Sequence, residues 1–302
     1  MNFLLETNDK RIGLTSIGLD GEELDALSFL PKPRIFCKPK TIVATAKDTL
    51  RLCQATYRIL EETFLSSALG NIVLIEIIEA GNCLIGGPSS MEEMKWLIQK
   101  MRTYQLDQIL IDGAFFRMSL SAVSDACIYV VGANKNIQME AVVRHFAAMM
   151  KLYHLKKSDF SLQGEENILF IEKDGNRLRL PIASLLDEDI IWAKLTTDTR
   201  SIWVPGVITP TFVQEWLRLR QKRNIELIIR DATHVVLPDA LLERMMRHHH
   251  FLSVRDTIPI AAVCYNPTSP KGYAFDEAAF RDALQAHTSL PLFNVKKEDG
   301  NE

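Results

Sequence analysis

Several short segments of this 302-residue chain carry side chains that could hold a cation or an anion. In one of them, the apolar run ILID ends at Asp112, and Gly113 follows it. A carboxylate at the end of a buried strand is where nucleotide-hydrolysing domains hold Mg²⁺ or its water. The alternative is that Asp112 begins and caps an ordinary turn, whose backbone Gly113 relaxes.

A second acidic segment, TSIGLDGEE at 15–23, has the same order of strand, glycine and acids. Asp20 and Glu22 could face a cation, or they could be turn residues exposed to solvent. Together with Asp112 and Gly113, they are the candidates for a nucleotide and magnesium site.

The segment EIIEAGNCLIGGPSSM at 76–91 combines acids with a glycine-rich loop. Glu76 interrupts an apolar run, and because a buried unpaired carboxylate is costly, it should face a cation or an open cleft. The loop leads into a helix with a serine N-cap and a glutamate three residues on, which is a capping box. Either this is only a well-capped helix start, or the glycines expose helix N–H groups to an anionic ligand. The candidates for this anion or substrate loop are Glu76, Glu79, Gly86, Gly87, Ser89 and Ser90.

Polar residues also follow apolar runs in the second half of the chain. The segment NPTSP at 266–270 is either a structural turn or a ligand loop formed by Asn266, Thr268 and Ser269. Asp231 and His234 follow another run, but DATHVV offers no nucleophile at a usable spacing. The histidines at 248–250 would point in different directions on a helix, so we predict no metal site there.

The usual fingerprints of nucleotide-binding and hydrolytic enzymes are missing from the sequence. It contains no Gly-Lys dipeptide, and therefore no GxxxxGK[ST] phosphate loop, and it lacks GxGxxG, HExxH and GxSxG. The motifs assign no catalytic residue, and we expect no independent enzymatic activity.

An α/β pattern in the first half must position these residues. Strands are expected at 11–17, 41–44, 71–78, 108–112 and 126–132, and helices at 48–64, 90–104 and 136–153. Near-continuous apolar strands separated by helices favour a mostly parallel sheet with helices on both faces. Ligands bind at the carboxyl ends of the strands in such a sheet.

The pattern changes near residue 156, which predicts two domains, 1–156 and 157–302. Within 160–184, two alternating runs flank Asp174 and Gly175, and this arrangement predicts a β-hairpin. Further strands are expected at 201–204, 226–230, 258–265 and 290–295, and helices at 211–222, 239–248 and 276–286. The second domain is therefore expected to be an α/β domain that a hairpin opens.

The composition is that of an ordinary globular protein, with 47% hydrophobic and 24% charged residues. A net charge of −3 gives no drive towards nucleic acid or anionic membranes. No apolar run is long enough to span a membrane, and the first residues do not resemble a signal peptide. Five scattered cysteines suit reduced thiols, so we expect a cytoplasmic protein.

Taken as a set, six segments resemble the B subunit of the lysine 5,6-aminomutase reactivase. They are KRIGLTSIGLDGEELD (10–25), PKPRIF (31–36), VATA (43–46), IEIIEAG (75–81), IGGPSSMEEM (85–94) and ILIDGAFFR (109–117). The resemblance is weaker beyond residue 156, where VVLPDALL and AVCYNPTSPKGYAFD still look similar. It implies an accessory subunit that acts by binding proteins. The implied partners are a MutS-like ATPase subunit and an aminomutase that uses adenosylcobalamin and pyridoxal phosphate.

The family pattern also resembles the dethiobiotin-synthetase branch of P-loop proteins. It places Asp112 beside the Mg²⁺ and γ-phosphate, and it makes Asp20 the first switch acid. In the family, a strand and a GKT-type phosphate loop precede the helix that corresponds here to MNFLLE. The resemblance therefore implies that the chain starts within that helix, through a misassigned start, removal of upstream residues or a genuine loss of nucleotide binding.

Two consequences follow from the missing loop. We expect this chain to bind Mg-ATP poorly unless an upstream phosphate loop exists. Because loss of a central strand exposes sheet edges, we also expect it to depend on a partner or to aggregate when alone. The rival function is an ATP- and Mg-dependent ligase-like enzyme of the dethiobiotin-synthetase type. The chain has no DxHxxG motif, so direct ligation of cobalamin is not expected.

Overall fold

The computed structural model describes residues 10–17, 35–67, 69–113 and 124–296. The chain divides into two compact units, Met1–Val123 and Ser124–Glu302. This division precedes the boundary expected near residue 156, because residues 127–153 pack with elements of the second unit. The protein is a mixed α/β protein with several sheets.

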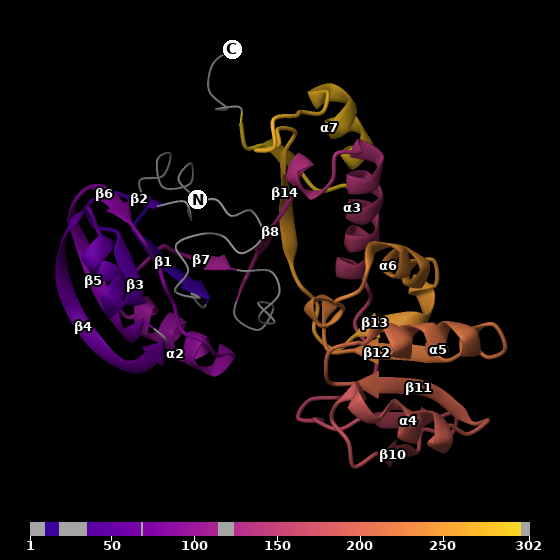
Figure 1. The fold of residues 1–302 in the computed structure, drawn as a ribbon. Helices are drawn as coiled ribbons and strands as arrows, with labels where there is room; N and C mark the ends of the chain where they lie inside the picture. The colour runs from indigo at the N-terminus through magenta and orange to yellow at the C-terminus, as the bar shows by residue number, and fades with distance from the viewer. Residues whose placement is uncertain (1–9, 18–34, 68, 114–123, 297–302) are drawn as a thin grey trace. The chain divides into compact units, whose positions relative to one another are not determined.

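The main sheet of the first unit has five strands in the order β4-β5-β3-β1-β7. Strands β1 (Ile12–Ile17), β3 (Ile42–Ala46) and β7 (Gln108–Gly113) are parallel to one another. Strands β5 (Gly70–Glu79) and β4 (Thr56–Ser67) add an antiparallel flank beyond β3. The sheet is therefore mixed, and the expectation of a mostly parallel sheet applies only to β1, β3 and β7 (Figure 1).

The two faces of this sheet are covered differently. Helix α2 (Met91–Arg102) buries Met94, Leu97 and Met101 against one face. The opposite face packs with a two-stranded sheet, β2 (Ile35–Cys37) and β6 (Gly81–Cys83). Within the described part of this unit, a helix thus covers one face and a strand pair the other, where helices on both faces were expected.

The helix expected at 48–64 is wrong. A 3₁₀ turn, η1 (Lys47–Leu52), is followed by the long strand β4. At the end of β4, Thr63 and Leu65 are buried while Phe64 is exposed, which is the two-residue period of a strand. Register shifts along β4 break that alternation, and they leave apolar residues at a spacing that imitates a helix.

The second unit contains a mixed sheet with the order β10-β9-β11-β12-β13. Its strands are β9 (Leu169–Glu172), β10 (Arg177–Arg179), β11 (Thr199–Val204), β12 (Glu226–Ile229) and β13 (Leu252–Val254). Strands β11, β12 and β13 are parallel, and β9 and β10 form an antiparallel hairpin. The hairpin predicted around Asp174 and Gly175 is confirmed, with Gly175 at a positive φ of 90°.

A second, all-parallel sheet of this unit has the order β15-β14-β8. Its strands are β8 (Cys127–Gly132), β14 (Ile260–Asn266) and β15 (Leu292–Asn294). The strand expected at 126–132 therefore forms, but it pairs with β14 and not with the sheet of the first unit. Its inward residues Tyr129 and Val131 join the large core of the second unit.

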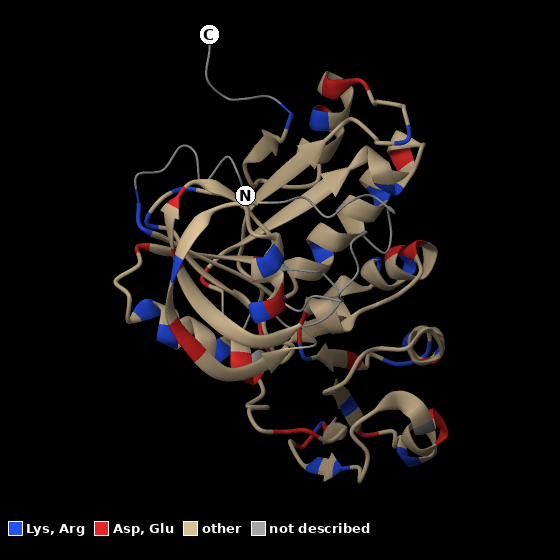
Figure 2. Cartoon of the chain, turned by 60° about the vertical axis from the view of Figure 1, so that its left-hand side comes forward, with Lys and Arg blue, Asp and Glu red and all other residues tan. Residues whose placement is uncertain are grey.

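Helices of the second unit pack on that core. They are α3 (Met139–Tyr153), α4 (Glu188–Lys194), α5 (Pro210–Arg220), α6 (Asp239–Met246) and α7 (Glu277–Gln285). The unit also has short 3₁₀ turns, η3 (Ala133–Lys135), η4 (Leu185–Asp187), η5 (Ala232–His234) and η6 (His249–Phe251). Of the helices described, none has the length and apolar character needed to cross a bilayer. Figure 2 shows Lys and Arg interspersed with Asp and Glu along the elements of each unit.

Candidate functional site

Asp112 lies at the carboxyl ends of the parallel strands of the first unit. It pairs in register with Ser16, and Gly113 pairs with Ile17. The side chain of Asp112 is exposed to solvent. This is the position predicted from the sequence, and it leaves the carboxylate accessible to a ligand.

The glycine-rich loop crosses the same edge. The Gly86 N–H donates to Thr45 Oγ1 at 2.9 Å, and the Ala46 N–H donates to the Gly86 carbonyl at 2.7 Å, at the end of β3. Gly87 lies on the end of β1, where an added Cβ would stand 1.5 Å from the Ser16 carbonyl oxygen. The structure therefore brings the loop to the strand ends near Asp112, and the Gly87 contact requires a residue without a side chain.

The capping box at the start of α2 is confirmed. Ser90 Oγ accepts the N–H of Glu93, and Glu93 Oε2 accepts the N–H of Ser90, both at 3.2 Å. Ser89 is exposed beside it. Because these contacts are internal, they support the interpretation that the loop is a well-capped helix start.

Glu76 and Glu79 lie at the other end of the sheet. Glu76 pairs in register with Ile42, the first residue of β3, and its carboxylate contacts Arg58 at 2.5 Å and Arg11 at 3.9 Å. Of the two alternatives for Glu76, the structure therefore shows a cation partner. The Thr56 hydroxyl donates to Glu79 at 2.6 Å. Neither carboxylate is brought to the glycine-rich loop.

Asp20 and Glu22 lie outside the described residues, so their place relative to Asp112 stays a prediction. In the second unit, the side chain of Asn266 accepts the N–H of Thr268 at 3.0 Å. Ser269 is buried, and its Oγ accepts the N–H of Lys271 at 3.2 Å. These bonds make the 266–270 segment a self-supporting turn, which favours the structural alternative.

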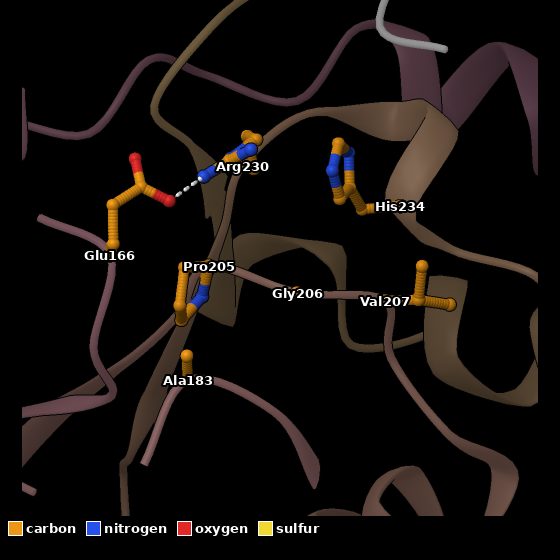
Figure 3. Close-up of a pocket in the computed structure, with 7 residues that line it drawn as sticks. All are labelled: Glu166, Ala183, Pro205, Gly206, Val207, Arg230 and His234. Atoms are coloured by element: carbon orange, nitrogen blue, oxygen red, sulfur yellow. Dashed lines mark hydrogen bonds and ion pairs between the residues drawn. The ribbon is translucent and has the colours of Figure 1, made fainter. Parts of the chain in front are cut away.

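A pocket in the second unit gathers residues that the sequence motifs did not single out as a site. Strands β11, β12 and β13 end in register at Val204, Ile229 and Val254. A cavity of about 220 Å³ opens at the ends of β11 and β12 (Figure 3). Its lining includes Glu166, Ala183, Pro205, Gly206, Arg230 and His234.

The sequence carried a signal for this edge. An Arg-Asp dipeptide follows β12, at Arg230, and another follows β13, at Arg255. Charged pairs directly after neighbouring apolar strands mark the carboxyl edge of a parallel sheet, where ligands bind. Of the residues at this edge, only Asp231 and His234 stand out in the sequence alone, and Arg230 does not.

A buried carboxylate orients the histidine of this pocket. Asp231 is fully buried, and its Oδ1 lies 3.1 Å from His234 Nδ1. The same oxygen accepts the N–H and the hydroxyl of Thr233. Because Nδ1 of His234 is engaged, Nε2 is the ring nitrogen left to meet a ligand.

Three cysteines that are distant in sequence meet in the first unit. The sulfurs of Cys53 and Cys83 are 3.3 Å apart. Burial, followed by the hydrogen bond with Cys83, raises the pKa of Cys53 to about 11, while a hydrogen bond with Cys37 and burial raise the pKa of Cys83. Protonated thiols are weak nucleophiles and metal ligands, so we expect this cluster to react slowly. Across the part of the chain that the structure describes, no group of three His, Cys, Asp or Glu residues is placed to hold a metal ion.

No protein-family model matches the sequence, and no curated protein or solved structure matches it either. The observations that bear on function are therefore the sequence motifs and the geometry at the two sets of strand ends.

Proposed function

We propose that the chain is an accessory subunit of an ATP-dependent reactivase for a lysine 5,6-aminomutase that uses adenosylcobalamin and pyridoxal phosphate. In this role it works by binding proteins. A MutS-like ATPase subunit supplies the energy, and this subunit contacts the aminomutase and favours the release of a damaged cofactor.

The observation that carries the proposal is the meeting of the family-like segments at one sheet edge. The segments containing Ser16, Thr45, Gly86, Gly87 and Asp112 are far apart in sequence and converge where β1, β3 and β7 end. Their order and spacing resemble the reactivase B subunit, and the contacts between them give that order a structural reason.

The outer strand of the same sheet supports a protein-binding role. Strand β4 lies at the end of the sheet, where Ile59 is 54% exposed and Phe64 is 74% exposed. The Phe64 ring packs edge-on against Trp96 of α2, with ring centroids 4.5 Å apart. Exposed apolar residues on an edge strand are typical of surfaces that contact another protein. We assign this surface to the ATPase subunit.

Co-purification tests the proposal. The full chain is mixed with the MutS-like ATPase subunit, with the aminomutase, and with both, and each mixture is separated by size-exclusion chromatography. The proposal expects this chain to co-elute with the ATPase subunit and with the larger assembly. Elution of the chain on its own in every mixture would contradict the proposal.

One observation favours a second function, that of an ATP- and Mg-dependent ligase-like enzyme of the dethiobiotin-synthetase type. Asp112 is exposed at the carboxyl edge of β7, beside the end of β1, where such enzymes hold Mg²⁺. Calorimetry with Mg-ATP on the wild type and on Asp112→Asn separates the two functions. Binding that Asp112→Asn weakens supports the enzyme. Because this chain lacks the phosphate loop, the result that argues against the enzyme is an absence of binding in a version of the chain extended upstream.

A further inference from the structure

We infer that the second unit carries a separate site for a short organic carboxylate with a neighbouring hydroxyl group, in the pocket at the ends of β11 and β12. This inference does not depend on the proposed function. It rests on a guanidinium, an oriented imidazole and a small cavity that the same strand ends bring together.

Arg230 is the anchor for the carboxylate. Its Nη2 donates to Glu166 Oε2 at 2.5 Å, so the pocket already places a carboxylate on this guanidinium. The Arg230 side chain is only 25% exposed, whereas that of Glu166 is 68% exposed. Exposed ion pairs contribute little, so a ligand carboxylate can displace Glu166 at small cost. The planar guanidinium then offers two parallel N–H groups to the incoming carboxylate.

The Nε atom of Arg230 supports this assignment. It is buried and has no hydrogen-bond partner among the described residues. A buried N–H group of a cation is costly when it has no hydrogen-bond acceptor. A ligand carboxylate that accepts hydrogen bonds from both Nε and Nη2 would supply that acceptor. Glu166 contacts only Nη2 in the described structure, so the Nε–H group still lacks an acceptor.

His234 supplies the second contact. Its main chain is fixed, because its carbonyl accepts the N–H of Ile208 at 2.8 Å, and Asp231 fixes its ring. The imidazole lines the same pocket as the guanidinium (Figure 3). An imidazole held at Nδ1 presents Nε2 to a hydroxyl group next to the ligand carboxylate, which is the reason for choosing a hydroxy acid over a plain acid.

The size and charge of the pocket narrow the ligand class further. A cavity of about 220 Å³ is smaller than the sites that hold drug-sized ligands, so it suits a molecule of a few heavy atoms. The carboxylate of Glu166 contacts the single arginine of the lining, and the buried carboxylate of Asp231 contacts the lining His234. A monoanion therefore fits this charge balance better than a phosphate dianion does.

Isothermal titration calorimetry on the full chain tests the inference, with glycolate, acetate and inorganic phosphate as probes. Glycolate should bind saturably at one site, acetate more weakly, and phosphate more weakly than glycolate. Arg230→Met should weaken glycolate binding about tenfold or more, because a charge-assisted pair is lost. Glu166→Gln should strengthen it, because the competing carboxylate is removed.

The variants are chosen so that misfolding cannot imitate the result. Glu166 is exposed, and its substitution is expected to raise affinity, which a damaged fold would not do. Arg218→Met removes a different exposed Arg–Glu pair, on α5, and should leave binding unchanged. The inference is overturned if the wild type shows no saturable binding of glycolate, if phosphate binds as tightly as glycolate, or if Arg230→Met leaves the affinity unaltered.

Discussion

Gly87 packs directly on the main chain of Ser16, so closely that a Cβ at position 87 would stand 1.5 Å from the Ser16 carbonyl oxygen. This contact holds the glycine-rich loop against the end of β1. It explains why the loop needs a glycine there, and it links the start of α2 to the strand edge at which Asp112 lies.

Gly87→Ala should therefore destabilise the first unit severely. The atom that the new methyl group meets belongs to the main chain, so relief requires the loop or β1 to move. We expect a loss of about 3 kcal/mol or more in the free energy of unfolding, measured by urea denaturation. Gly164→Ala is the control, because Gly164 has a positive φ but open space around it, and it should cost only about 1 kcal/mol. Equal effects of the two substitutions would contradict the packing argument.

Phe64→Glu should separate partner binding from folding. Phe64 is 74% exposed, so we expect a change within about 1 kcal/mol in the free energy of unfolding. A charge in the centre of a protein contact should lower the affinity for the ATPase subunit about tenfold or more, and co-elution with that subunit should decrease accordingly. Leu186→Glu is the matched control, because Leu186 is 89% exposed on the second unit and should have no effect. Unchanged binding by Phe64→Glu would exclude β4 from the interface.

The native thiol of Cys53 should react slowly with iodoacetamide. Its pKa is raised to about 11, chiefly by burial, so the thiolate that reacts is scarce at pH 8. Relative to the ordinary value of 9.0, this shift predicts about a hundredfold lower rate than in the urea-unfolded chain. The rate should rise as the pH approaches 11. Peptide mass spectrometry reports the rate at each cysteine, and equal native and unfolded rates at Cys53 would show that the thiol cluster is not buried as described.

Acidification should destabilise the second unit through His145. Burial, reinforced by the charge of Lys135, lowers the pKa of His145 below its ordinary 6.5. The unfolded chain then binds more protons than the folded chain as the pH falls below 6.5, so stability that is present above that pH is lost. Urea denaturation between pH 7.5 and 5 measures this loss. His145→Gln should flatten the dependence, whereas a slope that is the same in the variant would assign the effect to other groups.

Much of the fold could be predicted from local sequence. The apolar run at 71–78 indicated β5, the serine–glutamate spacing indicated the capping box of α2, and the Asp-Gly pair indicated the β9–β10 hairpin. These features are local, since each depends on residues within a few positions. The partner of β8 could not be predicted in this way, because pairing with β14 joins residues that are distant in sequence.

The candidate sites show the same limit. Asp112 could be placed at a strand end, because an apolar run precedes it. The partners of Glu76 could not, because Arg58 reaches it from β4 and Arg11 from the residue before β1. The Arg230 pocket could not be predicted for a related reason: the register of β11 and β12 brings together residues that no short motif contains.

Reactivation of the aminomutase tests the central claim most directly. An aminomutase carrying damaged adenosylcobalamin is incubated with the MutS-like ATPase subunit, ATP, Mg²⁺ and fresh adenosylcobalamin, with and without this chain, and the return of mutase activity is followed. The account predicts recovery only when this chain is present, and none when ATP is omitted. Recovery at the same rate without the chain, or no recovery from the complete mixture, would contradict it.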